Sequence, residues 1–286
     1  LMNTFRRPDA ARLTVGVIGA GRVGAVLGAS LRAAGHDVVA VSAVSEASRG
    51  RAEELLAGVP VLPPDEVAAS CALLLLAVPD DALPSLVQGL VDVGSVRAGQ
   101  LVAHTSGRHG LGVLSPAQGA LPMALHPVLP FTGTPLDLQR LHGVSFGVTS
   151  PEVVRPIAEA LVVEMGGEPV WVLDELRPLW HAALAHGANH LVTLVSSAAD
   201  LLREAGAEDP AAVLGPLLQA ALDGALQSGD AALTGPVSRG DAGTVAAHLA
   251  ALPEAIGPSY LALARLTADR ALASGRLAPQ RAEALL

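Results

Sequence analysis

A glycine-rich turn near the start of the chain restricts the possible folds more than any other feature. Residues 19–24 read Gly-Ala-Gly-Arg-Val-Gly, the pattern of a dinucleotide-binding turn. The turn directly follows a short apolar, β-branched run at 13–18 and directly precedes a helical pattern from about 23 to 34. A strand, this turn and a helix together cradle a pyrophosphate, so the sequence predicts a Rossmann domain here.

The three glycines of the turn have different expected roles. Gly19 permits the tight turn, Gly21 lets the backbone approach the pyrophosphate, and Gly24 lets the helix pack closely on the strand. The helix N-terminus offers free amide groups and a partial positive charge to the phosphates. We predict that the whole turn contacts the cofactor: Gly19, Ala20, Gly21, Arg22, Val23 and Gly24.

The end of the second predicted strand indicates which dinucleotide the turn serves. Sites that prefer NAD usually carry Asp or Glu about 20 residues beyond the glycines, but residues 42–45 here read Ser-Ala-Val-Ser. Ser42 or Ser45 together with Arg49 or Arg51 could hold a ribose phosphate instead. The alternative for both arginines is a solvated helix face. The predicted cofactor is therefore NADP, with NAD left open.

Strands and helices alternate beyond the turn and then the strands stop. The predicted strands are 13–18, 36–41, 59–61, 73–78, 101–104, 144–148 and 169–173. Helical segments separate most of them, which favours a mostly parallel sheet. After residue 174 the predicted elements are all helices: 177–204, 210–227, 241–251 and 257–274. The predicted class is α/β, with a flexible tail at 1–12, a doubly wound Rossmann domain at 13–174 and an all-helical domain at 175–286.

Composition and charge exclude several classes of function. The net charge is −9 and no basic run occurs, so we expect no nucleic-acid partner. No apolar run approaches the 18 or so residues of a membrane helix, and residues 1–12 lack the apolar core of a signal peptide. The single cysteine, Cys71, fits a reducing compartment, so the expected location is cytoplasmic. We expect no metal.

Lysine is absent from the chain: all 18 basic residues are arginines. Schiff-base chemistry and a lysine general acid are therefore excluded. Any proton or hydrogen bond for a reacting group must come from another kind of side chain.

Two predicted strands, 73–78 and 101–104, end at the cofactor crevice of this fold. Val78, Pro79 and His104 are expected to contact the cofactor, and Ser106 to face the reacting atoms. For Pro79 the alternative is a simple strand stop.

Reduction of a carbonyl or imine requires a proton or hydrogen-bond donor near the developing charge. His126 lies at a strand end, where Pro127 would hold it rigidly, and His181 lies early in the first helix of the helical domain. Asn189, two turns after His181, can point to the same side of that helix. We predict catalytic roles for these three residues. For each histidine the alternative is a capping or buried structural imidazole, and His186 would form a tighter pair with Asn189.

A substrate carboxylate would need a cationic partner. Arg239 is the candidate, because it lies in a predicted loop, 235–240, between two helices. The alternative is a plain helix connection in which Asp241 caps the next helix.

Several motifs make the chain resemble one bacterial family. They are 77–80 (Ala-Val-Pro-Asp), 104–107 (His-Thr-Ser-Gly), 125–127 (Leu-His-Pro), 180–189 (from Trp-His-Ala-Ala to Asn) and 233–241 (Leu-Thr-Gly-Pro-Val-Ser-Arg-Gly-Asp). Over about 13–272 the chain resembles proteins with a Rossmann-like domain followed by a DUF2520 domain. That family is similar in architecture to pyrroline-5-carboxylate reductase, prephenate dehydrogenase, 6-phosphogluconate dehydrogenase and ketopantoate reductase, and some members have been proposed to be ketopantoate reductases.

The resemblance implies an NAD(P)-dependent oxidoreductase that acts on a small, anionic substrate, a carboxylate-bearing carbonyl or imine such as ketopantoate. It also implies a homodimer formed through the helical domains. One feature departs from the wider superfamily, in which a Lys and an Asn lie one helical turn apart: Ala185 stands four residues before Asn189. A non-catalytic dinucleotide-binding or sensor protein is therefore the alternative function, and a crevice for another nucleotide cofactor or a modified substrate is the third.

Overall fold

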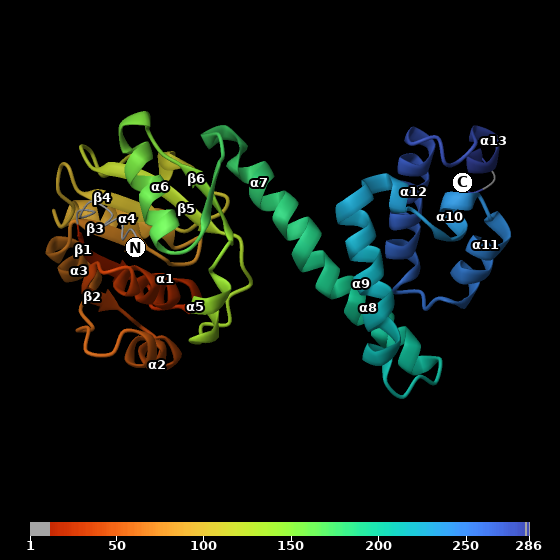
Figure 1. Ribbon diagram of the computed structural model, residues 1–286, viewed down its shortest axis with the longest axis horizontal. Coiled ribbons are helices and arrows are strands. Elements are labelled where there is room, and N and C mark those ends of the chain that lie inside the picture. Colours follow the sequence, from red (N-terminus) through yellow and green to blue (C-terminus); the bar gives the residue numbers. More distant parts are fainter. Residues whose placement is uncertain (1–11, 284, 286) are drawn as a thin grey trace, which may run out of the picture. The chain divides into compact units, whose positions relative to one another are not determined.

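The computed structural model describes residues 12–283 and 285 of the chain. The chain forms two compact units, Leu1–Gly187 and Ala188–Leu286 (Figure 1). Each unit is described by itself below. The tail predicted at 1–12 lies outside the described residues, except for Arg12.

The first unit is built on a seven-stranded sheet in the order β2-β1-β3-β4-β5-β6-β7. Its strands are β1 (Thr14–Ile18), β2 (Asp37–Ser42), β3 (Leu73–Leu76), β4 (Leu101–His104), β5 (Leu121–Pro127), β6 (Ser145–Thr149) and β7 (Glu168–Trp171). All neighbouring strands are parallel except β5 and β6, which are antiparallel. The predicted α/β class with a mostly parallel sheet is confirmed.

The strand predicted at 59–61 is wrong. Only Val61 pairs, through an isolated parallel bridge to Val41. Pro60 has no amide hydrogen and cannot donate to a neighbouring strand, so this segment forms no ladder.

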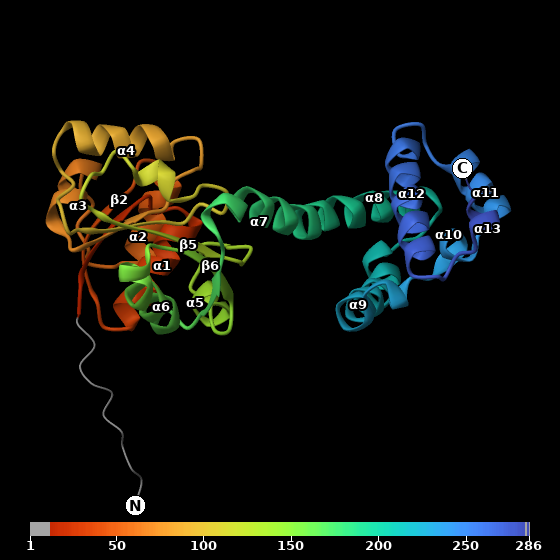
Figure 2. The same cartoon turned by 90° about the horizontal axis from the view of Figure 1, so that it is seen from above.

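Helices cover both faces of the sheet (Figure 2). Helices α1 (Arg22–Ala33) and α6 (Arg155–Glu164) pack on one face, and α3 (Pro64–Ser70) and α4 (Leu83–Asp92) pack on the other. The four leucines of β3 show why its sequence is uniformly apolar: Leu73 and Leu75 face the first layer, whereas Leu74 and Leu76 face the second. The remaining helices of this unit are α2 (Glu46–Leu55), α5 (Leu136–Arg140) and α7 (Arg177–Leu184).

The described part of the second unit is helical throughout. It contains α8 (His190–Glu204), α9 (Pro210–Ser228), α10 (Gly235–Arg239), α11 (Ala242–Ala251), α12 (Gly257–Ala273) and α13 (Pro279–Glu283). A π-helical segment, Ala185–Asn189, separates α7 from α8, so the single helix predicted at 177–204 is interrupted.

The loop predicted at 235–240 is also wrong, because residues 235–239 form the short helix α10. Pro236 lies at the start of this helix, where its missing amide hydrogen costs nothing, and Gly240 ends it in the left-handed conformation with φ 70°. Asp241 then caps α11 by accepting a hydrogen bond from the Thr244 amide at 3.1 Å. The expected cap at Asp241 is therefore present, whereas the role of Arg239 stays a prediction.

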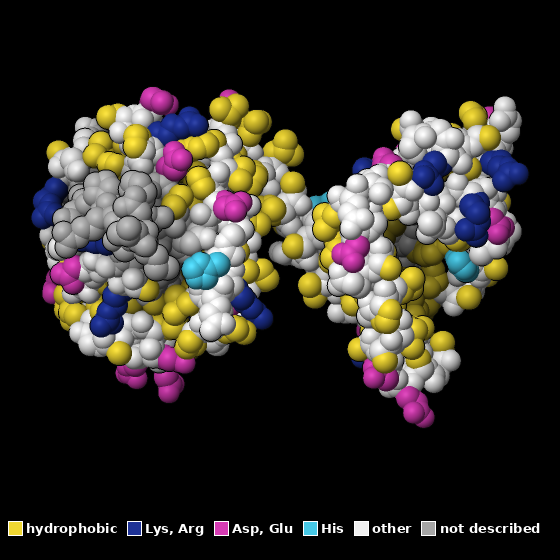
Figure 3. Space-filling model, in the orientation of Figure 1, with side chains coloured by type: hydrophobic (Ala, Val, Ile, Leu, Met, Phe, Trp, Pro, Cys, Tyr) yellow, Lys and Arg dark blue, Asp and Glu magenta, His cyan; other side chains and the backbone are white. Residues whose placement is uncertain are grey.

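The buried apolar core described in the second unit is small. Its buried cluster consists of Ala268, Ala271, Leu277 and Ala282, and Val245 is buried as well. Many large aliphatic side chains of α8, α9 and α12 are exposed instead: Leu191, Val192, Leu194, Val213, Leu217, Leu222, Leu226, Leu263 and Leu266. Figure 3 shows a hollow lined with hydrophobic side chains on this unit. Within the described ranges, no helix has the length and hydrophobicity needed to cross a bilayer.

Candidate functional site

The turn after β1 has the geometry that its glycines predict. Gly19 has φ 99°, and a Cβ there would lie 2.5 Å from the Ala77 carbonyl oxygen. A Cβ on Gly24 would overlap the Gly19 carbonyl oxygen and lie 2.8 Å from Ala77 Cβ. Both positions therefore exclude any side chain, because the turn and α1 pack directly on the chain that leaves β3.

Gly21 differs from the other two glycines because the space beside it is open. A Cβ at this position would meet no atom within 4 Å. Gly21 is also the N-terminal cap of α1, and no side chain caps the helix there. The first amides of α1 are thus available to an anionic group, which fits a dinucleotide pyrophosphate.

The end of β2 carries serine and no carboxylate. Ser42 is buried, and its carbonyl oxygen accepts hydrogen bonds from the amides of Gly19 at 3.2 Å and Ala20 at 2.9 Å. Ser45 caps α2 and accepts a hydrogen bond from the Ser48 amide at 3.1 Å. Ser42 therefore supports the turn through its backbone, whereas the exposed Ser45 remains a candidate phosphate contact.

Two arginines converge on Gly133, in the segment that follows β5. A Cβ on Gly133 would lie 2.7 Å from Arg51 Nε and 3.0 Å from Arg22 Cγ. Arg22 opens α1 and Arg51 lies on α2. The structure therefore places Arg51 next to Arg22, the arginine of the glycine turn. Arg51 is one of the two arginines, with Arg49, that the sequence offered for the ribose phosphate.

His104 ends β4 and is completely buried. Its Nε2 lies 3.2 Å from the Gly110 carbonyl oxygen, and its Nδ1 has no partner among the described residues. Burial, followed by the charge of Arg177, lowers the pKa of His104 to about 3. His104 is therefore neutral near pH 7, with one ring nitrogen free to accept a hydrogen bond.

The other predicted residues at the strand ends have structural contacts. The Ser106 hydroxyl accepts a hydrogen bond from the His109 amide at 3.1 Å. Val78 lies beside the turn, with Cγ1 at 3.2 Å from the position of a Gly19 Cβ. The Pro79 carbonyl accepts from the Ala82 amide at 2.9 Å, so Pro79 begins the turn into α4.

Two predicted catalytic histidines lie together, His126 near the end of β5 and His181 on α7. The rings of His126 and His181 are 5.7 Å apart and almost perpendicular. Gly107 separates them from the end of β4: a Cβ there would lie 2.5 Å from His181 Cδ2 and 2.9 Å from His126 Nε2. The structure thus brings together His126, His181 and the segment that contains Ser106.

Arg177 was not among the predicted site residues, although it supports the histidine site. It is fully buried at the start of α7 and donates to four neutral oxygens. These are the carbonyls of His109 at 2.6 Å, Ser106 at 2.6 Å and Gly147 at 3.3 Å, and Thr149 Oγ1 at 3.0 Å. None of the ion pairs among the described residues involves Arg177.

The buried charge of Arg177 changes the histidines beside it. Burial, then Arg177, then His181 lower the pKa of His126 to about 4. Burial also lowers the pKa of Arg177 itself, to about 10, so its guanidinium stays charged near neutral pH. His126 and His104 are therefore neutral hydrogen-bonding groups at pH 7. The sequence alone did not determine whether the predicted donor is charged or neutral.

Asn189 and Arg239 belong to the second unit. Asn189 ends the π-helical segment. Arg239 lies in the last turn of α10 and lines a hollow of about 740 Å³ together with Arg276 and Arg281. The Arg281 guanidinium donates to the Arg239 carbonyl at 3.1 Å. Arg239 is therefore one of three cations around an open space.

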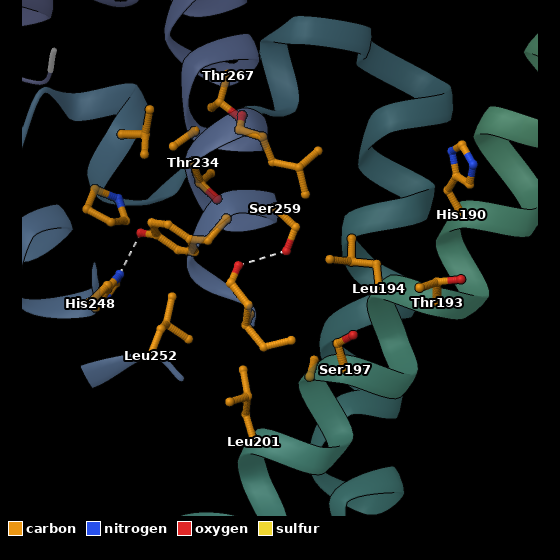
Figure 4. Close-up of a pocket in the computed structure, with 17 residues that line it drawn as sticks. His190, Thr193, Leu194, Ser197, Leu201, Thr234, His248, Leu252, Ser259 and Thr267 are labelled. Atoms are coloured by element: carbon orange, nitrogen blue, oxygen red, sulfur yellow. Dashed lines mark hydrogen bonds between the residues drawn. The ribbon is translucent and has the colours of Figure 1, made fainter. Parts of the chain in front are cut away.

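A second hollow, of about 620 Å³, lies between α8, α10, α11 and α12 (Figure 4). Aliphatic side chains such as Leu194, Leu201 and Leu263 form most of its wall. At one side of the hollow the hydroxyl oxygen of Tyr260 lies 2.8 Å from His248 Nδ1. In the part of the chain that is described, no group of three or more His, Cys, Asp or Glu residues could hold a metal ion.

Comparison with known proteins identifies two families along the chain. Residues 4–127 match the Rossmann-like domain, and residues 144–267 match the Domain of unknown function (DUF2520). None of the curated proteins matches the sequence.

Solved structures share the fold. A provisionally assigned NADP oxidoreductase from Bacteroides fragilis is 22% identical, with a TM-score of 0.77 over 90% of this chain and 98% of its own. A protein from Thermotoga maritima is 18% identical, with a TM-score of 0.66 over 92% and 100% of the two chains. A pyrroline-5-carboxylate reductase from Coxiella burnetii is 17% identical, with a TM-score of 0.56 over 96% and 99%.

Proposed function

Because this chain combines a Rossmann-like domain with a DUF2520 domain, we propose that it is an NADP-dependent oxidoreductase. The observation that carries the proposal is the glycine turn after β1. Gly19 and Gly24 have no space for side chains, and the uncapped start of α1 is open beside Gly21. The structural neighbours described as NADP oxidoreductase and pyrroline-5-carboxylate reductase support the same class.

NADPH, when bound, would supply the hydride that such a reaction transfers. The amides at the start of α1 hold its pyrophosphate, and Arg22 and Arg51 hold its ribose phosphate. His126, beside Gly107 and His181, donates a hydrogen bond to the substrate atom that gains negative charge. His181 orients the substrate in this proposal.

The proposed substrate is a small carbonyl or imine that carries a carboxylate, with ketopantoate as one candidate. Arg239 is the proposed partner of the carboxylate. Its place beside Arg276 and Arg281 supports this role, because three guanidinium groups around one hollow favour an anion.

The test is turnover of a substrate panel that contains ketopantoate, other 2-oxo acids and cyclic imines. We expect oxidation of NADPH, followed by its absorbance, with at least one of them. NADPH binding without any turnover would favour the alternative, a non-catalytic dinucleotide-binding or sensor protein, which the absence of lysine keeps open. A protein that binds neither NADPH nor NADH would contradict both functions.

The preference for NADPH is expected to depend on Arg51. Replacing Arg51 with Ala should weaken NADPH binding about tenfold to a hundredfold and leave NADH binding nearly unchanged, because one charge-assisted hydrogen bond to a phosphate is lost. Titration of both cofactors measures the ratio. Arg49→Ala, on the same helix, is the matched comparison, since the atoms nearest to the Gly133 position belong to Arg51 and Arg22 and not to Arg49. A larger loss at Arg49 would assign the ribose phosphate to Arg49 instead.

We further propose that the protein is a homodimer joined through its second unit. The small core there and the exposed leucines around the 620 Å³ hollow support this, because a helical domain needs a partner for such a surface. Light scattering after gel filtration should give about twice 28.8 kDa. Leu194→Asp, in the wall of the hollow, should yield monomer, whereas Val153→Asp, exposed on the first unit, should not. A wild-type mass of one chain would contradict the proposal.

A further inference from the structure

One hydrogen bond determines which nitrogen of His126 carries the proton. Trp180 Nε1 donates to His126 Nδ1 at 3.2 Å. An indole N–H can only donate, so Nδ1 must be the unprotonated nitrogen of the ring. In the neutral imidazole the hydrogen then lies on Nε2, which together with Cε1 forms the ring edge that faces Gly107.

The indole is held in place by the strand beneath it. His126 of β5 is paired in register with Gly147 of β6. A Cβ on Gly147 would lie 2.8 Å from Cε2 and Nε1 of Trp180, so only glycine lets the indole lie this close to the sheet. The Gly147 carbonyl also accepts a hydrogen bond from Arg177 at 3.3 Å. The position of the Trp180 N–H is therefore set by the packing of the indole on Gly147.

The charged and titratable groups around His126 also favour the neutral ring. After burial, Arg177 and His181, both of α7, lower the pKa of His126, and Asp80, in the segment after β3, raises it by less. Asp80 is paired with Arg108 at 3.3 Å. A cationic His126 would face the fixed charge of Arg177 and would point a second N–H at the indole donor.

We propose that Trp180 is a positioning residue that fixes His126 as a neutral donor through Nε2–H. This inference rests on the proposed oxidoreductase function for its catalytic consequence. When hydride adds to a carbonyl carbon, the π electron pair moves to the oxygen, and His126 Nε2–H donates a hydrogen bond to that oxygen. His126 keeps its proton, and the alkoxide takes its proton from water. The cofactor is oxidised and the carbonyl is reduced to an alcohol.

The first test reads the tautomer directly by nitrogen NMR of the full-length, histidine-labelled protein. His126→Asn assigns the signal. We expect the Nε2–H tautomer in the wild type from pH 7 down to about pH 5. Trp180→Phe, which keeps a ring over Gly147 and removes the N–H, should distribute the proton over both nitrogens. Trp171→Phe is the matched control, because Trp171 lies on β7, where Arg155 stacks on it, and should leave the signal unchanged.

A second variant guards against a Trp180→Phe protein that does not fold. Gly147→Ala keeps the indole but displaces it from its place on the sheet. This variant should therefore also distribute the His126 proton over both ring nitrogens. An imidazolium or an Nδ1–H tautomer in the wild type at pH 7 would overturn the proposal. So would a tautomer that neither variant changes.

The kinetic test uses the substrate that the panel identifies. Trp180→Phe should lower kcat about threefold to tenfold with KM and the NADPH Kd within about twofold, because the lost interaction acts on the transition state. The kcat of this variant should also gain a dependence on pH at values above about 4, because Nδ1 can take a proton once the indole N–H is gone. An unchanged kcat and pH profile would refute the catalytic part. If no substrate turns over, the proposed function fails, while the NMR result still decides the role of Trp180.

Discussion

Replacing Gly24 with Ala is expected to abolish NADPH binding and to destabilise the protein. The added Cβ would overlap the Gly19 carbonyl oxygen and press on Ala77, so either the turn or the start of α1 must move. Such overpacking costs about 1–3 kcal/mol of the free energy of unfolding. A displaced turn also misaligns every amide that should face the pyrophosphate, so we expect Kd to rise more than about a hundredfold.

Two other glycines separate stability from binding in this experiment. Gly21→Ala meets no protein atom within 4 Å, so the free energy of unfolding should stay nearly unchanged while NADPH binding weakens, because the methyl group occupies the space of the ligand. Gly50→Ala, on α2 and equally open, should affect neither binding nor folding adversely. Urea unfolding and NADPH titration of the three variants give the pattern. Wild-type binding by Gly24→Ala would refute the assignment of the turn.

Replacing Arg177 with Met is expected to give the largest loss of stability of any substitution at the histidine site. The variant leaves the carbonyls of Ser106, His109 and Gly147 without their donor in a buried place. A buried acceptor left without its donor costs about 1–3 kcal/mol, so the loss of these bonds together should cost about 3 kcal/mol or more of the free energy of unfolding. Urea unfolding measures it.

Arg108 provides the matched control for Arg177. Its side chain is exposed and pairs with Asp80 at 3.3 Å and Asp81 at 2.8 Å, so Arg108→Met should cost at most about 1 kcal/mol. If the two variants are equally stable, Arg177 does not hold the segment after β4. In a folded Arg177→Met protein, the pKa of His126 should also rise toward its usual value, because a cause of its lowering is gone.

The parts of the fold that the sequence predicted are those set by local chemistry. The glycine turn, the apolar run of β3 and the cap at Asp241 depend on residues close together in the chain. The absence of a carboxylate after β2 could likewise be read directly.

The contacts that shape the candidate site depend on residues far apart in the chain. Arg177 reaches Ser106 across 71 residues, and Trp180 reaches His126 across 54. Neither pairing leaves a pattern in a single sequence, because a buried arginine reads like any solvated one. The motif that contains Trp180 drew attention to His181 and Asn189, while the indole donor itself was overlooked.

The convergence of Arg22 and Arg51 on Gly133 has a practical consequence for changing the cofactor. A common strategy for redirecting a reductase toward NADH places an acidic residue at the end of β2. In this chain that position is Ser42, which is 4% exposed, so a carboxylate there would be buried beneath the turn at a high cost in stability. Redesign should therefore begin on the α2 side, at Arg51 and the exposed Ser45, and leave β2 intact.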